Sequence, residues 1–192
     1  MSASHGDDPV PTGPAEDFAR ASTAIETMIA AVRPDQWGEP TPCTEWNLRQ
    51  LVDHLVEVNY SLAERFGGTR GEPADNPVAA YRQSAQALSD ALALPGVLDQ
   101  TYAGPFANTT GDRQLQVRMA DLLTHGWDLA QTTGVQPDLP ADLVADALGF
   151  VEKLAAAFAR SGKFGTPQPV AADAPVLDKL AALTGRVVWP SD

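Results

Sequence analysis

Three side chains in this sequence have the types and the spacing needed to bind a divalent metal ion, and a fourth lies close to them on the same helix face. His125 has Asp121 four residues before it and Asp128 three residues after it, within the stretch DLLTHGWDLA. At 3.6 residues per helical turn, these three side chains share one face of a helix. His54 lies in another helical segment, LRQLVDHLVEV, at the edge of its apolar stripe. Two imidazoles and one carboxylate from two helices are a ligand set typical of zinc and other divalent transition metals.

Three protein ligands would leave one metal position open for water or substrate, as in catalytic sites. Spacing alone leaves a second interpretation open, because an Asp and a His four residues apart also pair on helix surfaces without a metal. Asp128 has two interpretations as well. It accepts a hydrogen bond from a ligand imidazole and fixes its tautomer, or it is an acid on the helix surface. The remaining histidine, His5, lies in the N-terminal leader and is set aside.

The elements that must position these residues are helices. Apolar residues recur at helical spacing, and prolines and glycines separate the segments. The predicted helices cover approximately residues 15–32, 46–66, 77–94, 113–132, 141–161 and 176–183. Thr44 or Asn47 is expected to cap the second helix, and Gly134 is expected to end the fourth. The pattern predicts an all-α, up-down helical bundle with an additional short C-terminal helix and no substantial sheet.

Composition and charge exclude several classes of function. The chain has 25 acidic and 13 basic residues and a net charge of −12, so it repels phosphate backbones and nucleic acid is not an expected partner. No run of about 18 apolar residues occurs, so no membrane span is expected. Residues 1–14 are acidic and rich in Pro and Gly, and they predict a flexible leader rather than a signal peptide; residues 15–192 are expected to form one domain. The single cysteine, Cys43, excludes an internal disulfide and, without a secretion signal, predicts a cytoplasmic protein.

Several other residues have both a chemical and a structural interpretation. Cys43 is either a thiol activated by the following helix N-terminus or, as we favour, a small residue that packs a Pro-rich turn. As a metal ligand it is disfavoured, because it lies about three helical turns from His54 along the chain. Trp46 and Trp127 are expected to be buried near the site, with Trp127 pointing away from the metal. The sequence does not distinguish among the arginines that could bind an anionic thiol, which are Arg49, Arg82, Arg113 and Arg118.

Three segments of the chain together resemble a known family. WGEPTPCTEWNLRQLVDHLV, MADLLTHGWDLAQTTG and FGTPQPVAADAPVLDKLAALTGR occur in that order between about Phe18 and Arg186. They resemble an actinobacterial metal-binding family of the DinB-like superfamily, related to the metal-binding domain of mycothiol-dependent maleylpyruvate isomerase. The resemblance implies a DinB-like four-helix bundle with a metal held by His54, Asp121 and His125.

The chain departs from the isomerase-type relatives in two respects. Their acidic ligand is Glu, whereas here the matching position is Asp121, which is one methylene shorter. They also carry an extra C-terminal domain that helps to form the active site, whereas this sequence ends soon after Arg186. We therefore expect that maleylpyruvate isomerase activity itself does not carry over.

Two functions of different class follow from these observations. The first is a metal-dependent enzyme that uses a low-molecular-weight thiol such as mycothiol, either as an S-transferase acting on a small electrophile or as a thiol-dependent isomerase. Zinc is the first candidate for the metal and nickel an alternative. The second is a non-catalytic metal-binding or ligand-binding helical bundle, which could form a homodimer. A cleft with an open metal position would favour the enzyme, and four protein ligands would indicate a structural site.

Overall fold

The described part of the chain is almost entirely helical. The computed structural model describes residues 13–72, 74–104, 108–161 and 165–188, so residues 1–12 of the expected leader lie outside it. The helices are α1 (Pro14–Ala30), α2 (Leu48–Arg65), α3 (Pro77–Leu92), α4 (Gly111–Thr133), α5 (Ala141–Ser161) and α6 (Val176–Leu183). Two short strands, β1 (Thr101–Tyr102) and β2 (Thr109–Thr110), pair antiparallel and form the only sheet within the described residues. The prediction of an all-α fold is confirmed.

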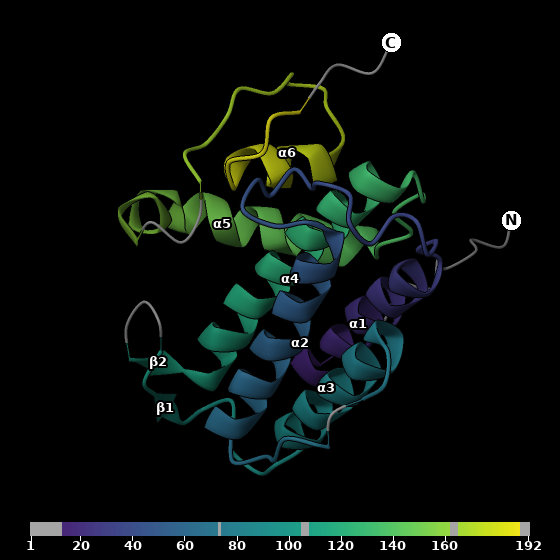
Figure 1. The fold of residues 1–192 in the computed structure, drawn as a ribbon. Helices are drawn as coiled ribbons and strands as arrows, with labels where there is room; N and C mark the ends of the chain where they lie inside the picture. Colours follow the sequence, from purple (N-terminus) through teal and green to yellow (C-terminus); the bar gives the residue numbers. More distant parts are fainter. Residues whose placement is uncertain (1–12, 73, 105–107, 162–164, 189–192) are drawn as a thin grey trace, which may run out of the picture.

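Helices α1 to α4 pack along one another, and α5 and α6 cover one end of them (Figure 1). Helix α1 contacts α3 and α4, while α2 contacts α3 and α4. Helices α2 and α4 run antiparallel: Arg65 at the end of α2 bonds Gln114 near the start of α4, and His54 lies beside Asp121 further along α4. Because of this pairing, the first half of α2 faces the second half of α4, close to the end that α5 and α6 cover.

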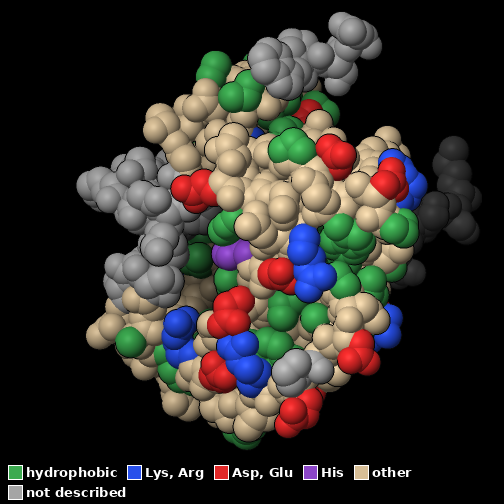
Figure 2. Space-filling view, viewed as in Figure 1, with side chains coloured by type: hydrophobic (Ala, Val, Ile, Leu, Met, Phe, Trp, Pro, Cys, Tyr) green, Lys and Arg blue, Asp and Glu red, His purple; other side chains and the backbone are tan. Residues whose placement is uncertain are grey.

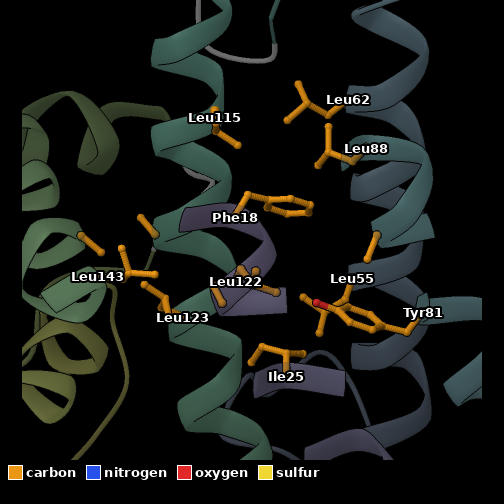
Figure 3. Close-up of a cluster of buried hydrophobic side chains, with 14 of the residues drawn as sticks. Phe18, Ile25, Leu55, Leu62, Tyr81, Leu88, Leu115, Leu122, Leu123 and Leu143 are labelled. Carbon is orange, nitrogen blue, oxygen red and sulfur yellow. The ribbon is translucent and has the colours of Figure 1, made fainter. Parts of the chain in front are cut away.

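The core lies between these helices and follows the apolar stripes in the sequence. Figure 3 shows side chains of α1, α2, α3, α4 and α5 meeting there, and those with the smallest exposure include Phe18, Ile25, Leu55, Tyr81 and Leu122. In α2 one position departs from what the residue types alone would suggest. Val58 is only partly buried, whereas the polar Asn59 is fully buried and bonds Ser84 of α3. None of the helices in the described part of the chain is long and apolar enough to cross a membrane.

Local capping fixes where the two helices of the site begin and end. Asn47, and not Thr44, caps α2: its side chain accepts from the backbone N–H of Gln50, whose side chain accepts from the N–H of Asn47. Helix α2 therefore starts at Leu48, two residues later than predicted. Gly134 ends α4 with φ +73°, the left-handed conformation that glycine adopts without strain.

The start of α4 is fixed by a close backbone approach at Gly111. Its N–H donates to the carbonyl of Gln100, and the N–H of Asp112 donates to that of Leu98. A β-carbon on Gly111 would collide with the carbonyl oxygen of Val97 and lie 3.1 Å from Cα of Leu98. The connection after α3 therefore packs directly on the first turn of α4, which requires a residue without a side chain.

Candidate metal centre

The structure brings together all three residues that the sequence nominated as metal ligands. Oδ1 of Asp121 lies 3.4 Å from Nε2 of His125 and 3.6 Å from Nε2 of His54. The two imidazole centroids are 5.1 Å apart, and one candidate ligand atom from each of the three residues lies within 4.8 Å of the others. Helix α4 supplies two of these residues one turn apart, and α2 supplies the third. Their role as metal ligands stays a prediction.

Two observations show that this triad (His54, Asp121 and His125) fits a metal ion. First, Nε2 of His54 is buried and has no hydrogen-bond partner among the described residues, which is costly unless something else satisfies it. Second, metal bonds of about 2.0–2.1 Å in a tetrahedron separate two ligand atoms by roughly 3.3–3.4 Å. The distances to Oδ1 of Asp121 are close to this value and longer than ordinary hydrogen bonds.

The ring of His125 is oriented by a buried carboxylate. Its Nδ1 lies 2.9 Å from Oδ2 of Asp128, so its Nε2 faces Asp121. Arg186 donates to both carboxylate oxygens of Asp128, at 3.2 and 2.7 Å. Burial alone would raise the pKa of Asp128, but hydrogen bonds from His125 and Arg186 outweigh it and lower the pKa. The interpretation of Asp128 as the acceptor for the ligand imidazole therefore agrees with the geometry, and the surface interpretation is wrong.

The carboxylate of Asp121 is divided between two environments. Oδ1 faces the imidazoles, while Oδ2 accepts a 2.6 Å bond from Nη1 of Arg118. Burial alone would raise the pKa of Asp121, but the imidazole of His125 and the guanidinium of Arg118 hold it well below its usual range. The carboxylate is therefore ionised at neutral pH, as metal binding requires.

The indole of Trp46 forms one wall of the site. It stacks on His54 with ring centroids 4.3 Å apart, and it lies 5.7 Å from the ring of His125. The turn before α2 holds it there, because Thr41 bonds the carbonyl of Trp46 through both its N–H and its hydroxyl. The side chain of His54 is 25% exposed, and Figure 2 shows histidine at the surface, near the centre of that face. His54 therefore lies at the surface edge of the site, while its Nε2 is buried on the inner side.

The other tryptophan predicted near the site behaves as expected. Trp127 is buried, points away from the triad, and donates from Nε1 to Asp178 of α6 at 2.7 Å. It therefore attaches α6 to α4 and brings the segment with Arg186 over the site.

Cys43 lies closer to the site than its sequence distance from His54 indicated. Atoms of Cys43, His125 and Asp128 that could ligate a metal lie within 4.8 Å of one another. This group is a poorer metal site than the triad, because Nδ1 of His125 and both oxygens of Asp128 already have partners. Burial raises the pKa of the Cys43 thiol, which favours a packing residue over an activated nucleophile.

The structure distinguishes among the candidate arginines. Arg49 bonds Asp53, Arg82 bonds Glu26, and the guanidinium of Arg113 lies over the ring of Phe150. Arg118 is buried and bonds Asp121, so it is unavailable to a dissolved anion. Arg186 was not among the predicted site residues, although it lies in a segment that carried the family resemblance. Its bond to Asp128 could not be predicted from local spacing, because the two residues are 58 positions apart in the sequence.

A cavity of about 520 Å³ lies elsewhere, between α1, α4 and α5, and none of the triad residues lines it. Its lining includes Asp17, Asp112, Arg113, Met119 and Phe150. Titratable side chains with the geometry of a ligand set occur at the triad instead, so we assign the candidate site there.

The chain is similar to known sequences over most of its length. Residues 18–130 match the family described as Mycothiol maleylpyruvate isomerase N-terminal domain, and this range contains the whole triad. Two uncharacterized proteins of Mycobacterium tuberculosis, from strains CDC 1551 / Oshkosh and ATCC 25618 / H37Rv, are each 36% identical over 174 residues. Each alignment covers 88% of this chain and 95% of the relative. No solved structure matches the chain.

Proposed function

This chain belongs to the family of the mycothiol maleylpyruvate isomerase N-terminal domain, and we propose that it binds a divalent metal ion through His54, Asp121 and His125 and uses it to activate a low-molecular-weight thiol. The observation that carries the proposal is the buried Nε2 of His54, which has no hydrogen-bond partner among the described residues and lies 3.6 Å from Oδ1 of Asp121. Zinc is the first candidate for the metal and nickel the alternative. We propose that residues 15–192 form one DinB-like domain. Its core would be an up-down four-helix bundle made of α1 to α4.

The charges of the site support an anionic ligand at the open position. Asp121 pairs with Arg118, and Asp128 pairs with Arg186, so the two carboxylates are balanced before any metal binds. Neutral imidazoles add no charge, so the charge of a divalent cation stays uncompensated. A thiolate satisfies this requirement, because a thiol that coordinates a metal loses its proton and becomes a nucleophile.

The residues around the triad hold and orient the side chains that would bind the metal. Asp128 fixes the ring of His125, Arg118 fixes the carboxylate of Asp121, and the indole of Trp46 covers one side of His54. In the proposed reaction the intact thiol would lose its proton and its sulfur would bond to a small electrophile, either by addition or by displacing a leaving group. Alternatively, the thiol would add to a substrate, assist its isomerisation and be released again. Mycothiol is the thiol that the family description names.

A non-catalytic function is the second candidate, and one observation favours it. The carboxylates of Asp121 and Asp128 are both bonded to arginines, so neither is free to act as a general base. In that case the bundle would bind the metal or another ligand, as a monomer or a homodimer, without turnover.

Elemental analysis and conjugation assays test the proposal. The purified full-length protein should contain about one zinc or nickel ion per chain and should conjugate mycothiol to at least one member of a panel of small electrophiles. His54→Ala should lose both the metal and the activity. Metal without turnover would favour the non-catalytic alternative, and a protein that cannot be loaded with zinc or nickel would refute metal binding in either function.

A further inference from the structure

Arg118 is a fully buried cation beside the candidate metal centre. Its side chain is 1% exposed, and all three guanidinium nitrogens have partners. Nη1 donates to Oδ2 of Asp121 at 2.6 Å, Nε donates to Oδ1 of Asn59 at 3.0 Å, and Nη2 donates to the carbonyl of Leu55 at 3.2 Å. A buried charge with this many bonds is held in one orientation.

The bonds continue beyond Arg118 into a third helix. Asn59 of α2 donates to Oγ of Ser84, and that hydroxyl donates to the carbonyl of Tyr81 in α3. Asn59 and Ser84 are fully buried. The network joins α2, α3 and α4, so Arg118 cannot turn away from Asp121 without leaving buried polar groups unpaired.

We infer that Arg118 is a positioning residue, which limits Asp121 to one donor atom and thereby keeps the metal centre open. This inference rests on the proposed metal site. Oδ2 of Asp121 is taken by the guanidinium at 2.6 Å, so Oδ1 is left for a metal. The triad then supplies two nitrogens and one oxygen.

The number of donor atoms determines whether a fourth ligand can bind. A carboxylate that used both oxygens would bring the protein donors to four, the number that closes a tetrahedral zinc site. With Oδ2 held by Arg118, one tetrahedral position stays free for an external ligand. The guanidinium also balances the charge of Asp121, so the metal retains its attraction for an anion.

Cobalt(II) is a suitable probe, since a thiolate that binds Co²⁺ gives an intense ligand-to-metal charge-transfer absorption. The metal-free full-length chain is loaded with Co²⁺ and titrated with 2-mercaptoethanol, and this absorption per bound cobalt is compared among variants. Arg118→Met frees Oδ2 to fill the open position and should lose a large part of the wild-type absorption. Arg118→Lys keeps a cationic donor against Oδ2 and should stay close to the wild type.

Arg65→Met is the matched control. Arg65 is a partly buried arginine of α2 that bonds the neutral side chain of Gln114 and not Asp121, so its replacement should leave the cobalt spectrum unchanged. Circular dichroism and thermal melting establish that each variant is folded. A folded Arg118→Met with the wild-type spectrum would overturn the inference.

A measurement on the wild-type protein covers the case in which Arg118→Met does not fold. X-ray absorption or a crystal structure of the zinc-loaded protein should find one oxygen of Asp121 at bonding distance, about 2.0–2.2 Å. Both oxygens at that distance would overturn the inference without any variant. A wild-type chain that binds neither Co²⁺ nor Zn²⁺ would instead refute the proposed metal site, so the two failures are distinguishable.

Discussion

Nδ1 of His125 lies 2.9 Å from Oδ2 of Asp128, whose side chain is fully buried. The contact directs Nε2 of the same ring toward Asp121. We expect Asp128→Asn to weaken Zn²⁺ binding about 10–100-fold, because an amide orients the imidazole less strongly and cannot balance Arg186. Competition with a chromophoric chelator measures the affinity of the folded variant.

The control for this change is Asp53→Asn. Asp53 is adjacent to His54, but its exposed carboxylate bonds Arg49 and lies outside the site. Its replacement should leave the Zn²⁺ affinity unchanged. An Asp128→Asn variant that binds as tightly as the wild type would contradict the assigned role of Asp128.

Replacing either histidine should remove the metal, but the two replacements should change the free energy of unfolding by different amounts. We expect His54→Ala and His125→Ala each to lose most of the bound zinc. In the metal-free state His125→Ala should be less stable by about 1–3 kcal/mol, because it removes the buried hydrogen bond between the His125 ring and Asp128. His54→Ala should cost less, since Nε2 of His54 has no hydrogen bond within the described chain.

Elemental analysis and denaturant unfolding of the metal-free variants measure these two effects. If both alanine variants keep the wild-type zinc content, the assignment of the triad is wrong. Equal loss of stability in the two variants would contradict the different hydrogen bonding of the two rings.

Metal binding should weaken as the pH falls. Burial alone would lower the pKa of His125, but Asp121 and Asp128 outweigh it and raise the pKa. A metal requires the neutral imidazole, so protons compete with it below the raised pKa. The loss of Zn²⁺ affinity should therefore begin above the ordinary imidazole pKa of about 6.5. Titrations from about pH 8 to pH 5.5 test this, and a constant affinity down to about pH 6 would contradict it.

Gly111→Ala should destabilise the fold without touching the site. The added methyl group would meet the carbonyl of Val97, which belongs to the backbone and cannot rotate away. We expect the free energy of unfolding to fall by about 1–3 kcal/mol. Gly149→Ala is the control, because open space surrounds Gly149 in α5 and alanine should stabilise the helix by about 0.5–1 kcal/mol. Urea unfolding of both variants measures the difference, and equal stabilities would contradict the close approach.

The helices were predictable because their apolar residues repeat with the helical period. Leu51 and Leu55 of α2 show this, and the Asp121–His125 spacing placed two site residues on one face. The β1–β2 pair was not foreseen as strands, because two residues per strand are too few to show an alternating pattern.

The partners of the site carboxylates were harder to predict, for two different reasons. Arg118 stands three residues before Asp121, and this spacing could have indicated an ion pair. Its burial could not be foreseen, because it depends on Asn59 from α2. Arg186 reaches Asp128 only because α6 packs on α4, a contact between segments distant in sequence.

The stacking of Trp46 on His54 gives the protein an intrinsic optical reporter. Indole fluorescence is quenched by a nearby protonated imidazole and changes when the motion of the neighbouring ring is restricted. The centroid of the Trp46 ring lies 4.3 Å from that of His54 and 5.7 Å from that of His125. The difference in emission between the wild type and Trp46→Phe therefore isolates the light from this one indole. Occupation of the site can be followed in the unlabelled chain, even with a colourless and spectroscopically silent ion such as zinc.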